Sequence, residues 1–222
     1  MSPTPTARPA VETLPGRVAE PPLTRLGAAM LAVALIWLLP DALAAHEGGA
    51  AVGLFNGLKH PVSGVDHVLA MVAVGLWGAQ LGQPAVWVLP VVFPMVMALG
   101  GMLGLLGIPI PGVEIGIALS AVVLGVVVLG EVKPPVTVTA LIVGLFAVFH
   151  GHAHGAELPE GASGVTYSLG FVVATGTLHA VGIAIGLVHR WPAGQKALRV
   201  AGAGVAAAGV AFLARALGWG DG

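Results

Sequence analysis

Apolar runs that follow one another with only short gaps are the feature that most limits how this chain can fold. A helix needs about 20 residues to cross the roughly 30 Å hydrocarbon core of a bilayer. The chain is 57% hydrophobic and only 9% charged, with a mean hydropathy of +0.96. We identify six runs of about this length, at residues 62–82, 85–107, 113–131, 136–154, 165–188 and 197–217. Because a backbone in lipid must satisfy its own hydrogen bonds, the sequence predicts an all-α, polytopic membrane helix bundle with six transmembrane helices.

The segment before these runs needs its own interpretation, because targeting segments imitate structure. Residues 1–23 are rich in proline and threonine and lack periodicity, so we expect a disordered extension there. Residues 24–45 hold an apolar core that ends in small residues in an A-x-A arrangement, which resembles a secretory signal peptide. An uncleaved anchor helix is the alternative. The six-helix transmembrane domain then occupies residues 46–222, and cleavage would leave the mature N-terminus outside the cytoplasm, close to His46.

Charges in the loops test this orientation. A chain that starts outside and crosses six times also ends outside. The loops expected in the cytoplasm then hold Lys133, Arg190, Lys196 and Arg199, whereas the external ones hold Lys59 and Arg215. This bias agrees with the positive-inside rule and predicts a multi-pass membrane protein whose mature N-terminus lies outside the cytoplasm. The sequence has no cluster of basic residues that would indicate a nucleic-acid partner.

Potential metal ligands gather at the ends of the runs that we place outside. They are His46, His60, Asp66 and His67 around the start of the first run, Glu114 at the start of the third, and His150, His152, His154 and Glu157 at the end of the fourth. Ionisable groups in or beside a bilayer are costly and indicate a function. The chain has no cysteine, which excludes thiolate sites. Imidazole and carboxylate groups suit divalent Ni, Co, Zn, Cu or Fe.

The stretch HPVSGVDH, which begins at His60, places three such groups close together. We expect Pro61 at the first helical position, with His60 just outside. His60 and His67 would share a face of a straight helix but lie about 10.5 Å apart along its axis. Either the first turn opens at Gly64 and Pro61, or His60 belongs to a neighbouring entry site. Asp66 either binds metal or orients a histidine.

A second group lies in FHGHAHGAELPEG, residues 149–161. On a helix His150, His154 and Glu157 would form one stripe, with His152 turned away. If the helix frays, His152 can join the other three. The alternative is a histidine-rich external loop with unspecific affinity for metals.

Two further residues each have two interpretations. His179, in ATGTLHAVG, would lie about 21 Å below the outer end of its helix. It is either an inner station on a permeation path, with Thr175 and Thr177 nearby, or a packing histidine bonded to a neighbour. Glu114 is either a metal ligand or an interfacial acid.

Three stretches resemble the HupE/UreJ family, membrane proteins associated with hydrogenase and urease maturation. They are HPVSGVDHVLAMVAVGLWGAQLG (60–82), FHGHAHGAELP (149–159) and GFVVATGTLHAVGIAIG (170–186). The resemblance extends from about His46 to the C-terminus, and it implies a secondary permease that imports Ni²⁺ or Co²⁺ across the bacterial inner membrane, which puts the mature N-terminus in the periplasm. It also implies a set of metal residues, namely His60, Asp66, His67, Glu114 and His150 with its neighbours His154 and Glu157. We expect no permanently bound cofactor, and further copies of the chain or metalloenzyme maturation proteins are candidate partners.

Two other classes of function compete with transport. GASG and HAVG fit the motifs around the serine and histidine of rhomboid proteases, but Ser163 and His179 would lie about 24 Å apart on one helix. A nucleophile and its base need contact at about 3 Å, so we expect no enzyme. An accessory protein that captures metal without transporting it is the other alternative. No nucleotide-binding motif occurs, so transport would draw on the membrane potential or on partner proteins.

Overall fold

The computed structural model describes residues 49–158 and 163–219. Its elements are the helices α2 (Gly49–Ser63), α3 (Val65–Leu81), α4 (Ala85–Leu105), α5 (Val113–Leu129), α6 (Val136–Ala156), α7 (Gly164–Gly186) and α8 (Pro192–Ala216), with the short 3-10 helix η2 (Leu187–Arg190) between the last two. The described residues include no strand, and each of the predicted apolar runs forms a helix, so the all-α prediction is confirmed. The predicted extension 1–23, the predicted signal peptide 24–45 and His46 lie outside the described residues.

Our prediction that the first helix starts at the beginning of the first apolar run is wrong, because another helix, α2, precedes it. We predicted Pro61 at a first helical position, whereas Pro61 lies inside the last turn of α2. The axes of α2 and α3 differ by 81°. Proline has no N–H to donate to the preceding turn, and Gly64 adopts an extended conformation with φ −94° and ψ 116° between the two helices. Ser63 Oγ donates to the His60 carbonyl at 2.7 Å, which satisfies an acceptor left by the end of α2.

Most of the helices have the length and composition needed to cross a membrane. Helices α4, α6 and α8 and the segment Gly164–Arg190 each meet both conditions, and the bent pair of α2 and α3 meets them together. Helix α5 is apolar but has only 17 residues, a rise of about 25 Å. The described residues therefore give four candidate spans, or five when the bent pair is one span, where the sequence predicts six.

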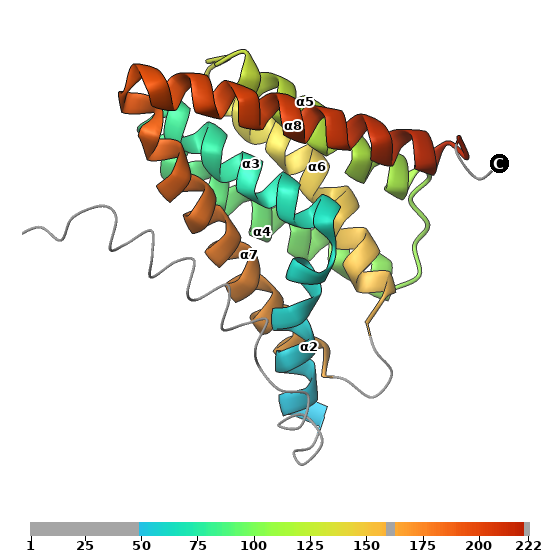
Figure 1. Cartoon of the computed structure of the whole chain (residues 1–222). Coiled ribbons are helices and arrows are strands. Elements are labelled where there is room, and N and C mark those ends of the chain that lie inside the picture. The colour runs from blue at the N-terminus through green and yellow to red at the C-terminus, as the bar shows by residue number, and fades with distance from the viewer. Residues whose placement is uncertain (1–48, 159–162, 220–222) are drawn as a thin grey trace, which may run out of the picture.

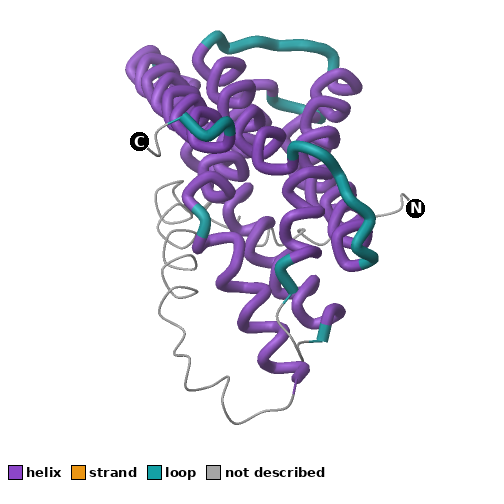
Figure 2. The backbone as a smooth tube through the Cα atoms, turned by 90° about the vertical axis from the view of Figure 1, so that its right-hand side faces the viewer, coloured by secondary structure: helices purple, strands orange, loops and turns teal. Residues whose placement is uncertain are grey.

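The chain reverses direction from one helix to the next between α3 and α8, because the glycine contacts pair α4 with α6 and α3 with α7 in the same direction and α5 with α8 in opposite directions. Figure 2 shows the described loops at the ends of these helices in teal. The starts of α3, α5 and α7 and the ends of α6 and α8 thus share one end of the bundle, which we call the histidine end. At the opposite end, Trp77 Nε1 donates to the Val132 carbonyl at 2.9 Å, and Gln80 Nε2 donates to the Val128 carbonyl at 3.1 Å. These bonds fasten the end of α3 to the end of α5.

Glycines let the helices pack in close pairs. Helix α4 packs mainly on α6 and α5 on α8, while α7 packs on both α2 and α3 (Figure 1). A Cβ atom on Gly151 of α6 would collide with the Met97 carbonyl oxygen of α4 and lie 2.9 Å from the Gly101 nitrogen. A Cβ atom on Gly75 of α3 would lie 2.8 Å from the Gly182 Cα of α7. Small residues allow such approach where lipid supplies no hydrophobic drive for association.

The α4–α6 contact gives a stability prediction. Gly151→Ala would force the two backbones apart, and overpacking of this kind costs about 1–3 kcal/mol. Gly176→Ala is the matched control, because nothing lies within 4 Å of a Cβ atom at Gly176 and alanine is the better helix former. We expect thermal melting of the purified variants, followed by circular dichroism, to show a lowered midpoint for Gly151→Ala alone. Equal midpoints would contradict the close α4–α6 contact.

Candidate metal site

The bend between α2 and α3 brings His60 and His67 to the same partner. The ring centroid of His154 lies 4.6 Å from that of His60 and 4.4 Å from that of His67. His154 is on α6 and therefore sits between the two histidines of HPVSGVDH. Of the two alternatives for His60, the structure has the one in which the chain opens at Gly64. The residues before this opening form an entire helix, α2.

Helix α6 supplies the other side of this cluster. It continues to Ala156, so His150 and His154 are one turn apart on its inner face, and their exposed fractions are 0% and 4%. The ring centroid of His150 lies 4.9 Å from that of His67. Glu157 follows at the end of the helix, and its Oε2 lies 3.1 Å from His60 Nε2. We call His60, His67, His150 and His154 the histidine cluster.

The cluster becomes less exposed from one side to the other. The side chains of Glu157 and His60 are 59% and 29% exposed, whereas His67 is 12% exposed and His150 is fully buried. Atoms that could bind one ion, taken one each from His60, His154 and Glu157, all lie within 4.8 Å of one another. The arrangement therefore has an accessible mouth with a carboxylate and a buried interior lined by imidazoles.

Asp66 holds His67 in place. Its Oδ1 accepts a hydrogen bond from the His67 backbone N–H at 3.0 Å and lies 3.0 Å from His67 Nδ1. A carboxylate at Nδ1 fixes the tautomer and leaves Nε2 for another partner. Gly64 makes room for this pair, since a Cβ atom there would lie 2.9 Å from both Asp66 Oδ1 and His67 Nδ1. Of the two roles that the sequence left open for Asp66, the geometry favours the orienting one.

Several ring nitrogens of the cluster are buried without a hydrogen-bond partner. His150 Nδ1–H donates to the Phe146 carbonyl at 3.0 Å, but His150 Nε2 has no partner. The same holds for His67 Nε2 and for both nitrogens of His154. Leaving a buried polar atom unpaired costs about 1–3 kcal/mol. Nitrogen donors that converge in this way, with carboxylates beside them and no thiolate, fit a divalent transition-metal ion.

Two other predicted residues lie away from the cluster. His152 turns outward, and its Nε2 lies 2.8 Å from the Ile108 carbonyl of the α4–α5 loop, so the frayed helix that would bring it inward does not occur. Glu114 lines a separate cavity of about 340 Å³ with Asp66 and Arg215. Asp66 lines this cavity and also contacts His67, so Asp66 links Glu114 to the cluster.

His179 lies deeper in the bundle. The Phe93 ring of α4 separates it from the cluster, with centroid distances of 5.6 Å to His150 and 5.2 Å to His179. His179 is fully buried, and neither of its ring nitrogens has a partner.

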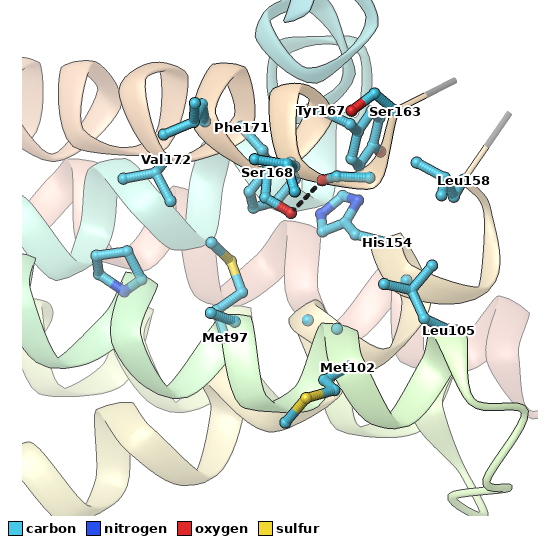
Figure 3. A pocket seen from close by; sticks show the side chains of 18 residues that line it. Met97, Met102, Leu105, His154, Leu158, Ser163, Tyr167, Ser168, Phe171 and Val172 are labelled. Carbon is cyan, nitrogen blue, oxygen red and sulfur yellow. Dashed lines mark hydrogen bonds between the residues drawn. The ribbon is translucent and has the colours of Figure 1, made fainter. Parts of the chain in front are cut away.

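Aromatic residues at the cluster are the part of the site that our sequence interpretation missed. The Phe171 ring centroid lies 4.2 Å from that of His154, and the centroid of Tyr167, the single tyrosine of the chain, lies 6.0 Å from that of His60. Both residues belong to α7 and line an apolar cavity of about 640 Å³ between α4, α6 and α7, into which His154 points (Figure 3). The signal was present in the four-residue spacing of Tyr167, Phe171, Thr175 and His179.

The protease-like pair is not assembled. Ser163 caps the start of α7, where its Oγ accepts a hydrogen bond from the Thr166 backbone N–H at 3.5 Å. His179 lies on the same helix about 24 Å further along. The two side chains therefore cannot act as nucleophile and base.

Comparison with known proteins agrees with the three stretches singled out in the sequence. A model of the family described as HupE / UreJ protein matches residues 29–212. Protein HupE of Rhizobium leguminosarum bv. viciae is 50% identical over 175 residues, which cover 79% of this chain and 92% of that protein. No solved structure matches the chain. Since the family match covers the described helices from α2 through most of α8, and the whole histidine cluster, the chain belongs to the HupE/UreJ family.

Proposed function

We propose that this protein is a secondary permease that imports a divalent transition-metal ion, Ni²⁺ or alternatively Co²⁺, across the bacterial inner membrane. The metal would serve the maturation of enzymes such as hydrogenase or urease. The observation that carries the proposal is the histidine cluster, in which three helices place four imidazoles and two carboxylates at one end of a bundle of apolar helices.

The cluster suits capture of a partly dehydrated cation. Glu157 and His60 form the accessible mouth, and His154 contacts His60 on one side and the partly buried His67 on the other, with the buried His150 next to His67. Each imidazole can replace a water of the ion, while the negative charges of Glu157 and Asp66 offset the cost of bringing a double charge among apolar helices. Glu114, in the neighbouring cavity with Asp66, adds a third carboxylate near the entrance.

Orientation in the membrane follows from the charges at the two ends. Lys133 follows α5, Arg190 ends η2, and Lys196 lies in the first turns of α8, so all three are opposite the histidine end. The positive-inside rule then puts the histidine end in the periplasm, where a mature N-terminus after signal-peptide cleavage would also lie. The membrane potential favours entry by about 2.3 kcal/mol per charge at 100 mV, hence about 4.6 kcal/mol for a divalent ion.

The contrast between two histidines of α6 tests the site. His154→Ala removes the imidazole at the centre of the cluster, whereas His152→Ala removes one that bonds to the Ile108 carbonyl. We expect nickel accumulation in cells to be lost in His154→Ala and kept in His152→Ala, with equal amounts of both proteins in the membrane. Accumulation at the wild-type level in His154→Ala would refute the assignment.

The pair of Asp66 and His67 gives a second test. Asp66→Ala frees the His67 ring, and His67→Ala removes a nitrogen that faces the cluster, so we expect either change to abolish nickel accumulation without loss of protein from the membrane. Asp66→Asn keeps the size of the side chain. Loss of a group that orients a metal ligand lowers metal affinity by about 10–100-fold. We therefore expect the nickel affinity of Asp66→Asn, measured by calorimetry, to be lower than that of the wild type by a factor in this range. Nickel uptake at the wild-type level in either alanine variant would refute the proposal.

Purified protein in vesicles separates transport from capture. With an inside-negative potential we expect labelled nickel to accumulate inside vesicles that contain this protein alone. Competition by unlabelled cobalt, copper and zinc then identifies the preferred ion. Collapsing the potential with an ionophore is the control and should slow uptake. Metal that binds the protein but never reaches the vesicle interior would instead identify a capturing accessory protein.

A further inference from the structure

A buried pair of side chains on α7 has no role in the histidine cluster. His179 and Thr175, one helical turn apart, are both fully buried. Both ring nitrogens of His179 and the Thr175 hydroxyl oxygen lack a hydrogen-bond partner. Among the other buried hydroxyls of the described residues, those of Ser120 and Thr139 each donate to a backbone carbonyl of their own chain segment, whereas that of Tyr167 also lacks a partner. Within the described residues, the buried hydroxyls that lack a partner, those of Tyr167 and Thr175, thus both belong to α7.

A purely structural role explains His179 poorly. A histidine with a packing role normally forms a hydrogen bond to a neighbour. Burying a polar group without such a bond destabilises the fold by about 1–3 kcal/mol according to protein mutational data. The α7 backbone lies close against α3 at this point, since a Cβ atom on Gly75 would collide with the His179 carbonyl oxygen. Polar groups kept in this state within apolar helices indicate a ligand that visits them.

The pair lies in line with the cluster. Tyr167, Phe171, Thr175 and His179 recur every four residues along α7, and all four are buried. This stripe starts beside the histidine cluster and ends at His179, which lies about 22 Å from the start of α7. The Phe93 ring stands at the boundary, in contact with an imidazole on each side.

We propose that His179 and Thr175 form a second, weaker station for the transported divalent cation, separated from the histidine cluster by the ring of Phe93. This inference rests on the proposed function and extends it from the entrance to the interior. One imidazole nitrogen and one hydroxyl oxygen would bind the ion, with water completing its coordination. Two protein donors hold a cation less tightly than the cluster does, and conduction requires sites weak enough for the ion to leave.

Metal titration of the full-length protein in lipid nanodiscs tests the station. Co²⁺ is the probe, because its visible absorption reports imidazole coordination. We expect the wild type to bind a tight and a weak class of Co²⁺, and His179→Leu, which keeps the bulk of the side chain, to lose the weak class alone. Thr175→Val should weaken that class, while Ser120→Ala, which removes a bonded buried hydroxyl, should leave both unchanged. A weak class that persists in His179→Leu would overturn the station.

Two further measurements guard against a misfolded variant and against failure of the wider proposal. His154→Ala should lose the tight class and keep the weak one; loss of both together would mean a single site and would also overturn the station. In vesicles, His179→Leu should reduce the nickel uptake rate at saturating metal by about tenfold or more, since a lost ligand should matter at least as much as a lost orienting group. An unchanged uptake rate in His179→Leu, measured beside an active wild type, would contradict the station but not the permease. A wild type that binds both classes of Co²⁺ without taking up nickel would contradict transport but not the station.

Discussion

The site depends on one break in the backbone. In a straight helix His60 and His67 would be two turns apart, and no single group could contact both. The 81° bend at Gly64 turns α2 away from α3, so that the two imidazoles approach His154 from different sides. The same glycine leaves room for Asp66 to sit against His67. A buried cluster of imidazoles thus follows from a proline and a glycine three residues apart.

Close packing of the remaining helices holds this arrangement. Glycines fix α6 against α4 and α7 against both α2 and α3, which sets the positions of His154 and of the aromatic residues around it. Because these contacts are between backbones, they resist movement more than contacts between long side chains would. Motion of an ion past Phe93 would then need a change in that side chain rather than separation of the helices.

Much of the fold could be predicted from hydropathy, because helices are the simplest way to satisfy a backbone in lipid. The stripe of His150, His154 and Glu157 also follows from helical periodicity, as does the outward turn of His152. Helix α2 was missed because we took Pro61 as the start of a helix, although proline is also tolerated where a helix is about to end. The contacts of Phe93 and Tyr167 with histidines of other helices depend on tertiary packing, which a single sequence does not encode in any local pattern.

The central claim is that imidazoles of the histidine cluster bind the metal directly. X-ray absorption at the nickel edge of the full-length, nickel-loaded protein would test this most directly, because imidazole rings give a characteristic multiple-scattering pattern. The structure predicts scattering from more than one imidazole together with oxygen ligands. A spectrum with oxygen ligands alone, as for hydrated nickel, would contradict the account.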